Sequence, residues 1–314
     1  MTPSRLHLLI DTDPGVDDAL AILMAHAQAE VAALTVAAGN VGLAHTVANA
    51  LKLVEHAGAA TPVHAGCATP LVLPAADAAF VHGSDGFGDV GYVPASTRAS
   101  AEHAANAIVR LARERPGELT LVALAPLTNL ALALRLDPAL PTRIRRLVVM
   151  GGAVTGRGNF ERVPTEFNIG FDPEAAHVVF ANWPQFELVD WEACVRHALP
   201  FARFDALLAG AGERARFYAA ISAKARAFNA ANGRGGMVVA DALAMAVALE
   251  PALVRRVERR HVGIELAGTL TRGATVVDWE GRNGQAPNAS IVLEVDQARF
   301  EALVARGLGL AQAT

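Results

Sequence analysis

The chain has 314 residues, of which 53% are hydrophobic and 18% are charged, enough for one large α/β domain with a sizeable core. Its formal net charge is −4 and it has no basic tail or patch, so nucleic acid is not an expected partner. The apolar run at residues 237–254 contains two acidic residues and a proline, so no membrane span is predicted there.

The two cysteines, Cys67 and Cys194, are far apart in the sequence. This spacing favours reduced, buried thiols in a cytoplasmic protein over a disulfide framework. A first strand is expected from Leu6 and an acidic loop from Asp11, which leaves no room for a signal peptide. We therefore expect a cytoplasmic location.

The first distinctive motif follows an apolar run at residues 6–10 and places four aspartates within eight residues: Asp11, Asp13, Asp17 and Asp18. Pro14 restricts φ and Gly15 permits positive φ, so a tight turn is predicted between a strand and a helix. One aspartate would serve as an ordinary helix cap, but four repel one another unless a cation or protons neutralise them. Oxygen ligands crowded on one loop favour Ca²⁺ or Mg²⁺.

Strands and helices alternate along the rest of the chain. Strands are predicted at residues 31–38, 62–66, 119–124, 146–150, 186–190, 275–279 and 291–295, and helices at residues 43–56, 101–115, 174–182 and 200–235. Continuous Val, Leu and Ile runs predict a mostly parallel central sheet covered by helices on both faces.

The polar motifs fall at the ends of these strands, and ligands bind at the carboxyl ends of the strands in such sheets. The site is therefore expected there. No linker or internal repeat is visible, so we expect a single domain over residues 1–314, with residues 200–235 as a candidate mobile helical cover.

The motif from Asp11 to Ala19 resembles the N-terminal signature of the inosine–uridine-preferring nucleoside hydrolase family. Further matches extend to about residue 241 and then to the C-terminal strands. The resemblance implies a nucleoside-hydrolase-like fold and a calcium-dependent enzyme that cleaves the N-glycosidic bond of a ribonucleoside, releasing free base and ribose. It also implies a homodimer or homotetramer.

The resemblance further implies a calcium site. Residues 125–130 are similar to a family turn in which the threonine backbone carbonyl, that of Thr128 here, ligates calcium, although a plain helix N-terminus is the alternative reading. Asp241 lies where the family has its last aspartate ligand. The implied ligand set is Asp13, Asp18, the Thr128 carbonyl and Asp241. Asp13 is also the candidate general base, because a carboxylate beside the metal can take a proton from its water.

The run at residues 165–169 is the second strong motif. In the family its Glu-Phe-Asn segment contacts ribose, which implies that Glu166 binds the 5′-hydroxyl and Asn168 the 3′ side. An extended backbone would place both side chains on one face, and solvated loop residues are the alternative. The other sugar contacts implied by the resemblance are Asp17, Asn40, Met150, Asn159 and Asp241.

The chain departs from the family at Ala240, where many members have a histidine thought to protonate the leaving base. Alanine donates no proton, so three alternatives remain. His82, on a loop that resembles the family's base-side loop, is the nearest candidate donor, and a merely exposed histidine is the other reading. Stacking on Phe228 or Trp279 with help from solvent is the second alternative, and an N-riboside whose base leaves unaided is the third. We therefore expect weak activity on inosine and uridine.

Two rival functions remain open. A non-catalytic nucleoside- or ribose-binding protein would keep the metal ligands, and release of free ribose separates it from a hydrolase. A metal-dependent phosphohydrolase also suits paired aspartates after a strand. The chain lacks a Gly-rich phosphate cradle with lysine, which counts against the second rival.

Overall fold

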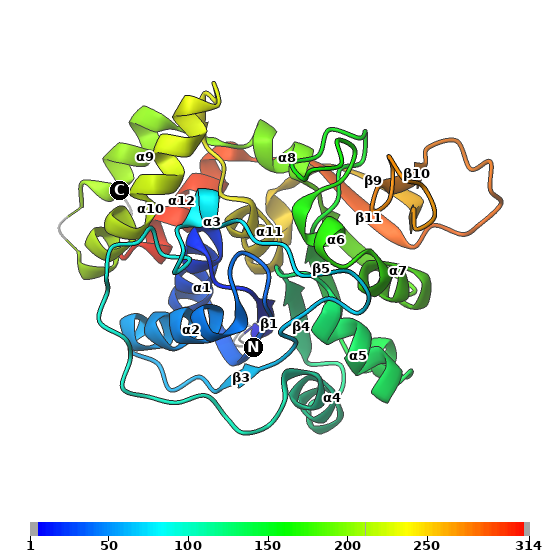
Figure 1. Cartoon of the computed structure of the whole chain (residues 1–314), viewed down its shortest axis with the longest axis horizontal. Helices are drawn as coiled ribbons and strands as arrows, with labels where there is room; N and C mark the ends of the chain where they lie inside the picture. Colours follow the sequence, from blue (N-terminus) through cyan, green and yellow to red (C-terminus); the bar gives the residue numbers. More distant parts are fainter. Residues whose placement is uncertain (1–5, 211, 311–314) are drawn as a thin grey trace.

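The computed structural model describes residues 6–210 and 212–310, and a central sheet with strand order β10-β9-β11-β6-β5-β4-β1-β2-β3 organises them (Figure 1). The strands are β1 (His7–Thr12), β2 (Glu30–Val36), β3 (Val63–Ala65), β4 (Leu119–Ala123), β5 (Arg146–Met150), β6 (Phe186–Val189), β9 (Val254–Ile264), β10 (Thr275–Asp278) and β11 (Ala289–Val295). Two short strands, β7 (Leu199–Pro200) and β8 (Gly236–Met237), form a separate antiparallel pair.

From β11 to β3 in this order, each strand runs parallel to its neighbours in the sheet. This confirms the predicted mostly parallel sheet. Strands β9 and β10 are added antiparallel at one end and project from the body (Figure 1). The sequence did not predict β9, because five of its eleven residues are charged and it lacks the continuous apolar run of a buried strand.

The helices are α1 (Val16–Gln28), α2 (Leu43–Ala57), α3 (Ala79–His82), α4 (Ala104–Glu114), α5 (Thr128–Leu136), α6 (Phe167–Phe171), α7 (Pro173–Asn182), α8 (Trp191–Arg196), α9 (Phe201–Leu208), α10 (Glu213–Ala231), α11 (Ala240–Leu249) and α12 (Gln297–Gly307). Short 3₁₀ turns, η1 (Leu140–Thr142) and η2 (Pro251–Leu253), precede β5 and β9. Helices α9 and α10 lie within residues 200–235, where helical structure was predicted. Within the described residues, no helix combines the length and apolarity needed to cross a bilayer.

Alternating side chains of the sheet build two hydrophobic cores. Leu8 and Ile10 of β1 pack with α1, α10, α11 and α12, whereas Leu9 packs on the other face with α4, α5 and α7. Successive strand residues point to opposite faces, so a parallel strand with helices on both sides must be apolar throughout. The strand ends are thereby held in register, and the loops that follow them meet at one edge.

A buried hydrogen-bond network ties three of these strand ends together. The Asp11 carboxylate accepts hydrogen bonds from Thr35 Oγ1 at 2.7 Å and Asn129 Nδ2 at 2.9 Å. Asn129 Oδ1 in turn accepts the backbone N–H of Cys67 at 2.9 Å. Burial raises the pKa of Asp11 to about 7. Asp11 therefore connects β1 to β2 and α5.

We expect Asn129→Leu to lower the free energy of unfolding by about 2–5 kcal/mol, because it leaves the Asp11 carboxylate and the Cys67 N–H short of buried partners. Urea denaturation measures the change. Asn182→Leu is the matched control, since Asn182 is exposed and its side-chain amide donates a hydrogen bond to the Val178 carbonyl. Equal effects of the two substitutions would contradict the structural role of the network.

Candidate active site

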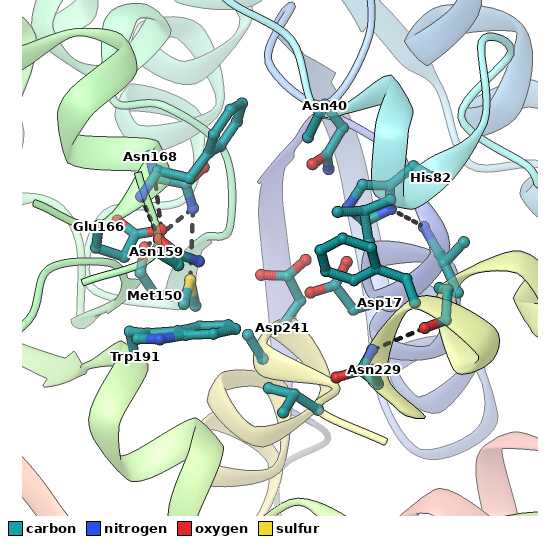
Figure 2. Close-up of a pocket in the computed structure, with 18 of the residues that line it drawn as sticks. Asp17, Asn40, His82, Met150, Asn159, Glu166, Asn168, Trp191, Asn229 and Asp241 are labelled. Carbon is teal, nitrogen blue, oxygen red and sulfur yellow. Dashed lines mark hydrogen bonds between the residues drawn. The ribbon is translucent and has the colours of Figure 1, made fainter. Parts of the chain in front are cut away.

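A cavity lies at the carboxyl ends of the parallel strands, between the loops after β1, β2, β4 and β5 and the helices α3 and α10 (Figure 2). It is lined by every side chain that the sequence assigned to substrate: Asp17, Asn40, His82, Met150, Asn159, Glu166, Asn168 and Asp241. The structure thus brings together residues from distant parts of the chain, while their contacts with a substrate stay a prediction.

The acidic loop is held by the start of α1. Asp18, at the third position of the helix, accepts the N–H of Gly15 at 3.1 Å through Oδ2. Its Oδ1 accepts Thr12 Oγ1 at 2.5 Å and the N–H of Asp13 at 3.2 Å. The bond to Gly15 satisfies a donor that a helix N-terminus leaves free, and the bonds to Thr12 and Asp13 tie the loop to the helix. Asp17 thereby lies at the edge of the cavity.

Three carboxylates meet below the cavity. Oxygen atoms of Asp17, Asp18 and Asp241 all lie within 4.8 Å of one another, because the N-termini of α1 and α11 converge there. Figure 2 shows the Asp17 and Asp241 carboxylates side by side. Burial and the neighbouring negative charges raise the pKa of Asp241 well above its usual range. A cluster of hard, mutually repelling oxygen donors suits a divalent cation of the Ca²⁺ or Mg²⁺ type.

The position of Asp13 differs from that of the three clustered aspartates. Asp13 Oδ2 accepts the N–H of Asn40 at 2.7 Å, and Asn40 Nδ2 donates to the Asp13 carbonyl and to Asp18 Oδ2. A Cβ on Gly39 would lie 2.1 Å from Asp13 Oδ2, so only glycine fits beside this carboxylate. The three-carboxylate cluster therefore does not contain Asp13, a predicted ligand, and contains Asp17, which the sequence analysis assigned to ribose binding.

Thr128 is buried at the start of α5, where its Oγ1 donates to Asp172 Oδ2 at 2.7 Å. This bond anchors the helix N-terminus. Asp13 does not belong to the three-carboxylate cluster, and Thr128 would contribute only its backbone carbonyl. Their roles as metal ligands stay predictions.

The wall opposite α3 comes from residues 159–168, and its backbone differs from the expected extended run. Glu166 is the N-cap of α6: its carboxylate accepts the N–H groups of Asn168, Ile169 and Gly152 at 2.9–3.1 Å. As an N-cap it folds back over the first helical turn, so it reaches the cavity together with Asn168 without strand alternation. Burial raises the pKa of Glu166 to about 7.

The two asparagines of this wall are oriented by the backbone. Asn168 Nδ2 donates to the Leu124 carbonyl at 2.7 Å. Asn159 Oδ1 accepts the N–H of Phe167 at 2.8 Å, so its amide nitrogen is directed away from that bond. Met150 Sδ lies 3.4 Å from Asn168 Nδ2 and closes the floor between the walls. The wall therefore offers polar atoms in set positions.

His82 is buried on the short helix α3, so the reading of an exposed loop histidine is wrong. Its Nδ1 accepts the backbone N–H of Val16 at 3.0 Å, which places the ring proton on Nε2. Burial lowers the pKa of His82 to about 4. The ring is therefore neutral at pH 7.

Helix α10 completes the cavity with Phe228 and Asn229, and Phe228 packs edge-on against Phe80 with ring centroids 5.6 Å apart. Trp191 and Arg234 are among the lining residues that sequence reasoning missed, and the Arg234 guanidinium lies 4.7 Å from the Trp191 ring centroid. Trp191 lies two residues after Val189, the carboxyl end of β6, and that position was the available signal.

Trp279 was the wrong choice of stacking residue. It lies beyond β10, within 5.9 Å of the Arg260 guanidinium, and it is not among the residues that line the cavity.

Comparison with known proteins gives one consistent result. The family model described as inosine-uridine preferring nucleoside hydrolase matches residues 8–302. The non-specific ribonucleoside hydrolase RihC of Klebsiella pneumoniae is 37% identical over 309 residues, which cover 98% of this chain and 99% of that protein. The RihC of Salmonella enteritidis is 38% identical over 307 residues, covering 97% of this chain and 98% of that protein.

Solved structures of nucleoside hydrolases superpose on nearly the whole chain. An inosine-guanosine nucleoside hydrolase superposes with a TM-score of 0.91 at 34% identity, covering 98% of this chain and 99% of that chain. A purine-preferring ribonucleoside hydrolase from Gardnerella vaginalis superposes with a TM-score of 0.89 at 29% identity, covering 98% of this chain and 100% of that chain.

We expect added Ca²⁺ to stabilise the folded chain, by about 2.7 kcal/mol when the ion is present at a hundred times its dissociation constant. Thermal unfolding with and without Ca²⁺ measures this. Asp241→Asn should abolish most of the shift while leaving the metal-free protein at least as stable, because it relieves repulsion among the three carboxylates. Glu161→Gln, an exposed change, is the control, and an undiminished shift in Asp241→Asn would contradict the site.

Proposed function

We propose that this chain, which belongs to the inosine–uridine-preferring nucleoside hydrolase family and hydrolyses ribonucleosides to free base and ribose, does so with a bound calcium ion. The observation that supports the metal is the cluster of Asp17, Asp18 and Asp241 below the cavity. Membership of this family favours a hydrolase over the nucleoside-binding protein and the phosphohydrolase that the sequence left open.

The proposed ligands are Asp13, Asp18, the Thr128 carbonyl and Asp241. Asp17 lies close enough to this group for the charge of the ion to neutralise its carboxylate as well. When bound, Ca²⁺ would lower the pKa of a coordinated water and neutralise the crowded carboxylates. Asp13 takes the proton of the attacking water. Its Oδ2 is occupied by the Asn40 N–H, which orients the carboxylate and leaves Oδ1 to act as the base.

In this proposal the ribose lies between the acidic floor, formed by Asp17, Asp18 and Asp241, and the wall formed by residues 159–168. Asp17 and Asp241 accept hydrogen bonds from the 2′- and 3′-hydroxyls, together with Asn40 and Asn168, while Glu166 and Asn159 bind the 5′-hydroxyl. Holding these groups places C1′ over the attacking water. The surrounding carboxylates stabilise the oxocarbenium-like transition state, which gains positive charge as the base leaves.

His82 is a poor candidate for the missing acid. Its Nδ1 is occupied by the Val16 N–H, so at neutral pH the ring offers only the Nε2–H as a hydrogen-bond donor. Giving up that proton would leave an imidazolate, which is far too basic to form here. His82 is therefore proposed to hydrogen-bond the base without protonating it.

We also propose a homodimer or homotetramer located in the cytoplasm. Both rest on the family resemblance and, for the location, on the two free cysteines.

A panel of nucleosides assayed for free ribose tests the calcium-dependent mechanism. We expect a chelator to abolish ribose release and added Ca²⁺ to restore it, because the acidic floor binds sugar only when its charge is neutralised. Asp13→Asn should lower kcat by about 10²–10⁴-fold, the usual effect of losing a general base. Asp77→Asn, an exposed change, should have no effect. Full activity of both the chelated enzyme and Asp13→Asn would refute the mechanism.

Deoxynucleosides test the sugar wall. We expect 5′-deoxy and 3′-deoxy nucleosides to have kcat/KM about 10–100-fold below the parent nucleoside, because buried polar groups of Glu166 and Asn168 lose their partners. Asn168→Ala should turn over the parent and the 3′-deoxy compound more equally, while still rejecting the 5′-deoxy compound. If the wild type does not distinguish 3′-deoxy from parent nucleosides, Asn168 is wrongly assigned.

A further inference from the structure

We propose that Arg234 is a catalytic residue that stabilises the negative charge of the departing base. It would replace the general acid that is missing here because the chain has Ala240 in place of histidine. The inference rests on the proposed function and names the group that completes it. It also names the substrate class: N-ribosides whose base departs as an anion, with charge spread over a ring nitrogen or a carbonyl oxygen.

The charges around the cavity support this role. Asp17, Glu166 and Asp241 contribute three carboxylates, and within residues 6–210 and 212–310 Arg234 is the one lysine or arginine that lines the cavity. His82 is neutral at pH 7. The carboxylates suit the positive charge that develops on the sugar, whereas a leaving base develops negative charge and needs a cation.

The guanidinium of Arg234 is left available by its surroundings. Most arginines of the chain pair with carboxylates, as Arg146 does with Glu187 and Arg226 with Asp205. In the described part of the chain, Arg234 has no carboxylate partner and no side-chain hydrogen bond, and its contact is the Trp191 ring at 4.7 Å. Stacking on an aromatic face orients the guanidinium plane and leaves its N–H groups to a ligand.

The backbone holds Arg234 in place. Two residues beyond the end of α10, Gly233 adopts the left-handed conformation at φ +69°, and the N–H of Arg234 bonds back to the Asn229 carbonyl at 3.1 Å. This is the geometry of a Schellman helix end. Trp191 opens α8 behind its N-cap Asp190, which accepts the Ala193 N–H at 3.0 Å. Trp191 and Arg234 are thus both held in position by the ends of helices.

The step balances without a protein acid. The bond between C1′ and the base nitrogen breaks, and its electron pair leaves with the base. The water oxygen bonds to C1′ and its proton passes to Asp13. Arg234 donates hydrogen bonds to the anionic base but keeps its protons, since guanidinium stays charged in proteins. The base then takes up a proton from solvent. With this help, inosine and uridine become better substrates than Ala240 alone would suggest.

The test compares two leaving groups. Inosine needs help to lose its base, whereas 4-nitrophenyl β-D-riboside has a leaving group that departs as a stable anion. Arg234→Gln should lower kcat on inosine by about 10²–10³-fold, as loss of a transition-state donor does, and change kcat on the nitrophenyl riboside by less than about threefold. Arg234→Lys retains the charge, so its kcat on inosine should be about tenfold higher than that of Arg234→Gln.

Arg226→Gln is the matched control. Arg226 is on α10 and stacks on Phe201 at the same 4.7 Å, but it pairs with Asp205 and does not line the cavity. Its substitution should leave both rates within about threefold of wild type. Circular dichroism checks that each variant is folded.

Two results would overturn the inference. An equal fall of both rates in Arg234→Gln would show a structural or positioning role, and an unchanged rate on inosine would show no role. A wild type that releases ribose from neither compound contradicts the proposed function and this inference with it. A fall confined to inosine supports both.

Discussion

The repulsion among buried carboxylates is the constraint on which the rest of the structure depends. Asp17, Asp18 and Asp241 are held together although burial and like charge oppose their ionisation. Two helix N-termini, α1 and α11, supply the partial positive charge that offsets this cost, and the N–H groups of Asp13 and Gly15 bond Asp18 directly. The packing of α1 on α11 in one hydrophobic core is what brings the acids into contact.

Around this acidic floor, the two sides of the cavity differ in chemistry. The Glu166 side uses polar groups already bonded to backbone N–H and C=O, so their orientation does not depend on a ligand. The α10 side is built from aromatic rings and Arg234, which pairs with no carboxylate in the part of the chain that the structure describes, and such a surface suits a flat ring. This division matches a reaction in which positive charge grows on the sugar and negative charge on the base.

The substitution at Ala240 has a consequence that extends beyond one residue. Without a histidine at that position, the cavity keeps no protonated imidazole, because His82 has its Nδ1 committed to Val16. Our proposal therefore assigns the electrostatic help to a group whose charge does not depend on pH. Arginine meets that requirement, and the end of α10 presents Arg234 to the cavity.

Much of the fold and many site residues were accessible from the sequence, for a physical reason. The aspartate loop and the apolar strands are local patterns, and near neighbours in sequence constrain one another through turns and helix starts. The assignment of Glu166 and Asn168 to the site came instead from the resemblance to the family, and the extended backbone expected there proved to be a helix start. The sheet class followed from continuous apolar strands between helices. The charged strand β9 was missed because it is partly exposed and pairs antiparallel.

Only the tertiary structure decided which groups meet across long sequence distances. His82 Nδ1 accepts the N–H of Val16, 66 residues away, and this contact sets the tautomer of the ring. Trp191 stacks with Arg234 because α8 and the end of α10 approach from different parts of the chain. The choice of Trp191 over Trp279, and the grouping of Asp17 with Asp241, were settled in the same way. Local periodicity carries no information on such contacts, since they arise when packed elements bring distant side chains together.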